Sequence, residues 1–187
     1  MKLSLNILKM DDLSLYLLDL VQNSIAARAS TIELIIVEDD MLHVSIIDNG
    51  IGMDSKTVER VTSPFYTTRK TRKVGLGLPL IKMLTEQTDG TFSIHSALNQ
   101  GTTLKLTFNH HHLDMPPFGN LGEMVYMISI HQDVNNFTFT YEKNGEQYIY
   151  SLSEMKSLLG ETIFEHSMMQ ALIELINQEI EKIRGNL

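Results

Sequence analysis

The residues best suited to chemistry are Asp48, Gly50 and Gly52, which follow an apolar run from Val44 to Ile47. Such a run is typical of a strand buried on at least one face, so Asp48 is predicted to be a fixed acceptor at the end of that strand. The two glycines add a wall without side chains. A flat heterocycle could approach this wall while its exocyclic amine donates to Asp48. The pair Asn49-Gly50 is also common in plain hairpin turns, which is the alternative interpretation.

A carboxylate and an amide, Asp19 and Asn23, lie upstream on a predicted helix at about residues 12–28. Apolar residues recur there at helical spacing, and positions four apart stack on one face of a helix. The two side chains are either a surface pair or a site. In the site, Asn23 would supply an oxygen to Mg²⁺, and Asp19 would orient a water or a hydroxyl.

A third feature is a basic run, with four cations between residues 69 and 73 that begin with Arg69. It is either a solvated loop or a mobile lid whose cations neutralise phosphates. The run leads into Gly75 and Gly77, which open a predicted helix at residues 76–88. A Gly-x-Gly that opens a helix exposes backbone N–H groups at the positive end of the helix dipole, where anions bind.

The elements that must position these residues follow from the hydrophobic pattern. Residues 3–8 are predicted to be a short strand or an extended arm, and Asp54 and Ser55 are predicted to start a short helix that ends near Val61. Strands are expected at about 31–37, 42–47, 91–96 and 102–108, and the last of them contains Thr102. A threonine there could reach a neighbouring ring or a bridging water.

Composition narrows the class of protein. The chain has 187 residues, 15 Lys and Arg against 23 Asp and Glu, and a formal net charge of −8. This charge disfavours a general nucleic-acid binder or a binder of anionic membranes. There are no cysteines, no signal-peptide pattern and no apolar run long enough to cross a bilayer, so we expect a cytoplasmic protein.

Taken together, the motifs resemble those of the GHKL ATPases, the superfamily of gyrase B-type enzymes, heat-shock chaperones, histidine kinases and MutL. The segment from Asp19 to Ile25 is similar to the MutL and gyrase version. Pro64-Phe65, Gly75-Leu76-Gly77-Leu78 and Gly101-Thr102-Thr103 are similar to the sensor histidine kinase version. The resemblance covers about residues 11–109. It implies a two-layer α/β (α+β) sandwich of the histidine kinase-like type, a mixed sheet with helices on one face.

The resemblance also implies ATP and Mg²⁺ as ligands. At the base, Asp48 would hold the adenine amino group, Gly50 and Gly52 would line the ring, and Thr102 would support the Asp48 contact.

At the phosphates, the resemblance implies that Asn23 would ligate Mg²⁺ and that Gly75 and Gly77 would cradle the triphosphate. Asp19 is the candidate base. The ATPase branches usually have glutamate at this position, and aspartate is one methylene shorter, so we expect slow hydrolysis or closure by a partner.

Three functions remain open for such a chain. Only about ten residues precede the first helix, which leaves no room for the hairpin that carries the phosphoaccepting histidine in sensor kinases, so we expect a histidine kinase-like protein without its own phosphoacceptor domain. It would transfer or hydrolyse the γ-phosphate of ATP in a regulatory role. The alternatives are a nucleotide-driven switch that controls dimerisation or partner release, and a partner-binding module with little turnover. A protein partner is expected in each case.

Residues 110–187 are predicted to be a helix–hairpin–helix appendage to the ATP-binding domain at 11–109, with residues 1–10 as an arm. Its helices are expected at about 120–131, 153–159 and 164–184, and its strands at 137–141 and 147–152. We expect the last helix to pack on this hairpin rather than to bind a partner. His110, His111 and His112 are a solvated linker or phosphoacceptors, or His110 and His112 form a metal site with Asp114.

Overall fold

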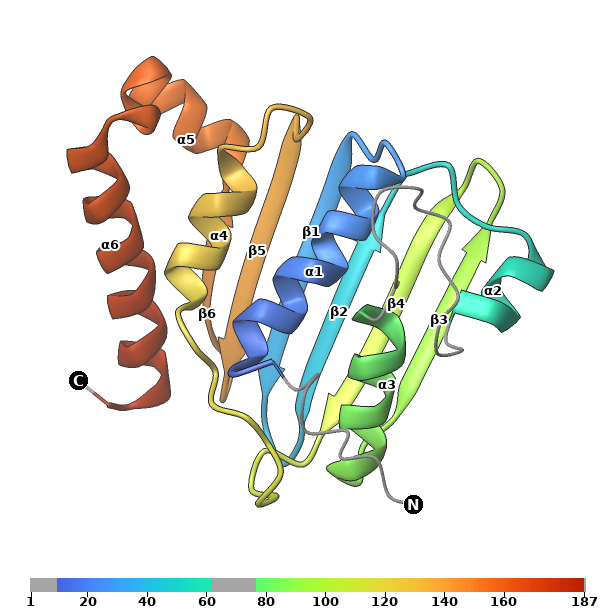
Figure 1. Cartoon of the computed structure of the whole chain (residues 1–187). Coiled ribbons are helices and arrows are strands. Elements are labelled where there is room, and N and C mark those ends of the chain that lie inside the picture. Colours follow the sequence, from blue (N-terminus) through green and yellow to red (C-terminus); the bar gives the residue numbers. More distant parts are fainter. Residues whose placement is uncertain (1–9, 62–76, 187) are drawn as a thin grey trace.

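Six strands form one mixed sheet in the order β3-β4-β2-β1-β5-β6 (Figure 1). The computed structural model describes residues 10–61 and 77–186. The strands are β1 (Thr31–Glu38), β2 (Leu42–Asp48), β3 (Phe92–Ala97), β4 (Gly101–Phe108), β5 (Asn136–Lys143) and β6 (Glu146–Ser151). All neighbours pair antiparallel except β1 and β5, which run parallel.

Helices α1 (Leu13–Ala26), α3 (Gly77–Gln87) and α4 (Leu121–Ser129) lie across one face of this sheet (Figure 1). The other helical elements within the described residues are α2 (Ser55–Val61), α5 (Leu152–Leu159), the 3₁₀ turn η2 (Gly160–Phe164) and α6 (His166–Arg184). The predicted mixed sheet with helices on one face is therefore confirmed. The predicted elements within the described residues are present with ends shifted by at most two positions, whereas the arm at 3–8 and the basic run lie outside those residues.

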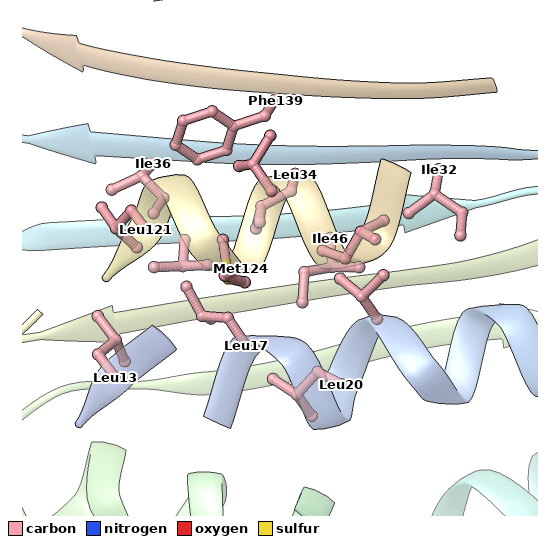
Figure 2. Packing of buried hydrophobic residues seen from close by; sticks show 14 of the residues in the cluster. Leu13, Leu17, Leu20, Ile32, Leu34, Ile36, Ile46, Leu121, Met124 and Phe139 are labelled. Atoms are coloured by element: carbon pink, nitrogen blue, oxygen red, sulfur yellow. The ribbon is translucent and has the colours of Figure 1, made fainter. Parts of the chain in front are cut away.

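The core forms between α1, α4 and the inner face of the sheet. Leu13, Leu17 and Leu20 recur on one side of α1, and all three are buried. They pack towards alternate residues of β1 and towards Met124 of α4 (Figure 2). Because side chains in a strand alternate between faces, β1 buries every second residue against the helices. This packing holds the polar side of α1 in a fixed place relative to the end of β2.

The C-terminal residues extend this sheet. β5 pairs with β1 along its whole length, from Thr31 opposite Asn136 to Glu38 opposite Lys143, and β6 completes a hairpin with β5. Helix α6 packs on α4 and on both strands of the hairpin. Strands from both sides of the boundary predicted at residue 110 therefore share one sheet, and a separate role for residues 110–187 stays a proposal. None of the helices in the described part of the chain is long and apolar enough to span a membrane.

Candidate functional site

Asp48 lies at the end of β2 with its side chain turned to the helix-covered face, and only 8% of its surface is exposed. The hydroxyl of Ser24 on α1 donates to its Oδ2 atom at 2.7 Å, and the backbone N–H of Gly50 donates to Oδ1 at 2.9 Å. A carboxylate has about four lone-pair sites, so these two bonds leave it able to accept from a further donor. The predicted buried acceptor is present, and its orientation is set from two elements.

The residues after Asp48 do not form a plain hairpin turn. The side-chain oxygen of Asn49 accepts from the backbone N–H groups of Ser30 and Thr31, both at 2.9 Å, and its Nδ2 donates to the Ser30 hydroxyl. The chain then continues into α2 rather than into a strand paired with β2. Asn49 therefore ties the loop to the start of β1, and the hairpin alternative was wrong.

Two glycines allow this loop to lie directly against the turn between β3 and β4. Gly52 has φ +64°, and a Cβ there would lie 1.9 Å from the carbonyl oxygen of Ala97. Gly101 has φ +81°, and its Cβ would lie 1.9 Å from the carbonyl oxygen of Asp48. L-residues with side chains disfavour this backbone region, and neither contact leaves room for a methyl group. A Cβ on Gly50 would lie 2.8 Å from the Ala27 carbonyl oxygen, so Gly50 lies against the end of α1.

Thr102 lies directly opposite Asp48 in the pairing of β2 with β4. Its hydroxyl lies 3.0 Å from that of Ser96, which itself donates to the Gly101 carbonyl at 2.8 Å and accepts from the Met53 N–H at 2.9 Å. Because the Ser96 proton is directed to Gly101, Thr102 is the donor in the hydroxyl pair. The pairing register places Thr102 beside Asp48, and the hydroxyl oxygen of Thr102 can still accept a hydrogen bond.

Asp19 and Asn23 are half-buried on α1 and lie beside the first residue of α3. A Cβ on Gly77 would lie 1.9 Å from Oδ2 of Asp19 and 3.9 Å from Nδ2 of Asn23. The N-terminus of α3, where the first N–H groups have no partner within the helix, thus lies against the polar side of α1. The structure therefore brings Gly77 together with Asp19 and Asn23, whereas Arg69 and Gly75 lie outside the described residues.

Sequence reasoning missed two residues of this site, Ser24 and Ser96. Ser24 carried a signal, because it lies on the buried stripe of α1 directly after Asn23, and a hydroxyl on a buried stripe needs a hydrogen-bond partner. Ser96 carried none, since a serine near the end of a strand is common. Its three bonds appear only once β3, β4 and the loop after β2 are placed together.

The linker histidines do not gather around a metal position. The rings of His110 and His111 meet edge to face with centroids 4.2 Å apart, and Nδ1 of His112 accepts from the Asp114 N–H at 3.1 Å. Partial burial, together with the neighbouring His111, lowers the pKa of His110. Within residues 10–61 and 77–186, no group of three or more His, Cys, Asp or Glu side chains could hold a metal ion. His110, His112 and Asp114 therefore form no such site.

Sequence comparison with known proteins identifies the family of this chain. Residues 9–112 match the family described as histidine kinase-, DNA gyrase B-, and HSP90-like ATPase. A putative sensor protein of Shewanella frigidimarina is 37% identical over an alignment of 97 positions, which covers 49% of this chain and 15% of that protein. Sporulation kinase A of Bacillus subtilis is 31% identical over an alignment of 94 positions, which also covers 49% of this chain and 15% of that protein. The chain thus spans a small part of the length of these relatives.

The fold has a counterpart among solved structures. The N-terminal domain of a DNA repair protein aligns with a TM-score of 0.59 and 17% identity, covering 82% of this chain and 58% of that one. Residues 1–112 are too few to supply that coverage, so the likeness extends into the strands and helices after residue 112. The family match covers more than half of the sequence and includes Asp48 and the polar face of α1. The chain belongs to the family of histidine kinase-, DNA gyrase B-, and HSP90-like ATPases.

Proposed function

We propose that this chain binds ATP with Mg²⁺ between α1, the loop after β2 and the N-terminus of α3. The observation that supports this most is the arrangement of side chains along α1. Ser24 holds Asp48 at one end of the site, whereas Asp19 and Asn23 face Gly77 at the other. One helix therefore carries the contacts for a base and for a phosphate chain.

At the base end, Asp48 would accept from the exocyclic amine of adenine. Its two donors, Ser24 and the Gly50 N–H, occupy one position on each oxygen and fix the plane of the carboxylate. Gly50 would line the ring, although the space that its Cβ would take is filled by Ala27 at the end of α1. Gly52 would do so too, although the contact that the structure gives it is with the β3–β4 turn. Thr102 would accept from a bridging water beside Asp48.

At the phosphate end, Gly77 and Gly75 would offer backbone N–H groups, and Arg69 would neutralise charge. The donor set suits Mg²⁺, which prefers oxygen ligands and is held in nucleotide sites largely by phosphates and water. Asn23 would contribute the protein oxygen.

For catalysis, we propose that Asp19 acts as a base. Its carboxylate lies at the start of α3, where a γ-phosphate held by helix N–H groups would be within reach. Asp19 would accept the proton of an attacking water or of a partner's acceptor group. Mg²⁺, when bound, would neutralise charge on the phosphates. The regulatory role would be that of a histidine kinase-like phosphotransferase or ATPase acting on a protein partner.

The second candidate is a nucleotide-driven switch with little turnover. Two observations favour it: Asp19 is one methylene shorter than the glutamate usual at this position in the ATPase branches, and its carboxylate lies against Gly77. In this form, nucleotide binding would change how the chain dimerises or holds a partner.

An experiment with labelled ATP distinguishes the two candidate functions. The chain is incubated with γ-labelled ATP and Mg²⁺, and label is followed in free phosphate and on protein, with Asp19→Asn as the test variant and Asp40→Asn, an exposed aspartate of the β1–β2 turn, as the control. Turnover that is lost in Asp19→Asn but kept in Asp40→Asn supports Asp19 as the base. ATP binding without turnover in the unaltered chain supports the switch. Phosphate release by Asp19→Asn at the rate of the unaltered chain refutes the proposed role of Asp19.

A further inference from the structure

The N-terminus of α1 is capped by a segment that follows the family domain at residues 9–112. The backbone N–H groups of Leu13 and Ser14 donate to the carbonyl oxygens of Pro117 and Phe118 at 2.9 and 3.0 Å. The first N–H groups of a helix have no partner within the helix, so the contacts that satisfy them help to set its position. The segment around Phe118 therefore supports the helix that carries Asp19 and Asn23.

The same segment is held in turn by the last helix. The guanidinium carbon of Arg184, near the end of α6, lies 4.3 Å from the centre of the Phe118 ring. Nε of Arg184 also lies 3.2 Å from Glu38, a buried carboxylate that accepts from the Tyr141 hydroxyl and lies 2.8 Å from Nζ of Lys143. Cation–π contacts and charged hydrogen bonds of this kind are strongest where the groups are shielded from water.

We infer that Arg184 is a positioning residue for the nucleotide site. Arg184 is paired with Glu38 and contacts the Phe118 ring, so it holds the segment at Pro117 and Phe118 that caps α1. Helix α1 in turn presents Asp19 and Asn23 to the start of α3. The inference rests on the proposed function for the identity of the ligand. It assigns to the C-terminal helix a role in the phosphate end of the site.

The two ends of α1 are held differently, and this difference yields a specific expectation. The C-terminal end is fixed to the base site through Ser24 and Asp48, and through the Ile51 N–H that donates to the Ala27 carbonyl at 2.9 Å. Release of the N-terminal end would therefore move Asp19 more than Ser24. Binding of the triphosphate should weaken, whereas binding of the nucleoside should not.

The test variant is Arg184→Met, which keeps an apolar side chain near Phe118 and removes the charge. Glu38 retains Lys143 and Tyr141 as partners, so the buried carboxylate is not left alone. The matched control is Lys182→Met on the same helix, whose ammonium group is exposed and pairs with Glu179 at 3.8 Å. Phe118→Leu is the second test variant. It leaves the ion pairs of Glu38 in place and decides the question if Arg184→Met does not fold.

Two measurements are needed. We expect Arg184→Met to weaken the affinity for ATP with Mg²⁺ by about 3- to 30-fold, with adenosine affinity changed by less than about twofold. We also expect hydrogen exchange at the amides of Leu13 and Ser14 to speed up by about 3- to 30-fold. Lys182→Met should change neither. Unchanged exchange at these amides, unchanged ATP affinity, or equal losses for ATP and adenosine would each overturn the inference. An unaltered chain that binds no ATP would refute the proposed function, and the exchange data alone would then decide whether Arg184 positions α1.

Discussion

Replacing the carboxylate of Asp48 by an amide is the sharpest perturbation of the base site. The fold should tolerate Asp48→Asn, because an asparagine oxygen can still accept from the Gly50 N–H. Its amide group can donate to the Ser24 hydroxyl, which changes from donor to acceptor. What the variant loses is the acceptor that faces the ligand. A donor now meets the adenine amine.

The magnitude follows from the burial of this site. Asp48 is 8% exposed, so water cannot readily replace the lost acceptor. An unmatched buried polar group costs about 1–3 kcal/mol, which corresponds to a loss of roughly 5- to 150-fold in ATP affinity. Isothermal titration of ATP with Mg²⁺ measures this directly, and urea unfolding checks that the variant is folded. The exposed Asp40→Asn is the matched control.

A ligand that lacks the amine makes the assay specific. Purine riboside triphosphate should bind the unaltered chain more weakly than ATP does. It should bind Asp48→Asn about as well as it binds the unaltered chain, because this nucleotide has no amine that could donate to Asp48. ATP affinity that is unchanged in a folded Asp48→Asn protein would refute the assignment of Asp48 to the base. Equal losses of affinity for ATP and for purine riboside triphosphate would refute this assignment as well.

Three further changes test how the site and the sheet are held. Ser24→Ala removes the donor to Oδ2 of Asp48 and should lower the free energy of unfolding by about 1–3 kcal/mol in urea titrations; a change near zero would contradict this support. Gly52→Ala should destabilise the chain by more than about 1–2 kcal/mol, clearly more than Gly145→Ala, which has φ +81° but no atom within 4 Å of the added Cβ; equal losses would exclude the predicted clash. Burial alone would raise the pKa of Glu38, but hydrogen bonds from Lys143 and Tyr141 and the charge of Arg184 outweigh it and leave the pKa lowered from 4.5. This contribution to stability is complete above pH 4.5 and is lost as the pH falls through the lowered pKa, so Glu38→Gln should lose less stability between pH 7 and pH 3 than the unaltered chain does.

The family domain could be predicted because its local signals agree with its packing. The apolar stripe of α1, the alternation in β1 and the acceptor at the end of β2 each follow from periodicities that a folded sheet preserves. The spacing of Asp19 and Asn23 placed both on one side of α1. Their meeting with Gly77 needed the family resemblance, since nothing local brings α3 to α1.

The parts that could not be predicted depend on contacts between distant residues. Nothing in the alternation of β5 shows that it pairs with β1, more than one hundred positions earlier, because a hairpin and a sheet edge share the same pattern. Glu38 looks like a surface glutamate at the end of a strand. Its burial becomes understandable only when Tyr141, Lys143 and Arg184 arrive from the C-terminal third.

The most direct test of the central claim is a comparison of ATP and GTP, each titrated with Mg²⁺ onto the unaltered chain. Guanine presents a carbonyl oxygen where adenine presents its amine, and that oxygen would meet the Asp48 carboxylate, an acceptor that is buried and fixed by Ser24 and Gly50. The account predicts saturable binding of ATP and at least about tenfold weaker binding of GTP. Absence of ATP binding, or equal binding of both nucleotides, would contradict it.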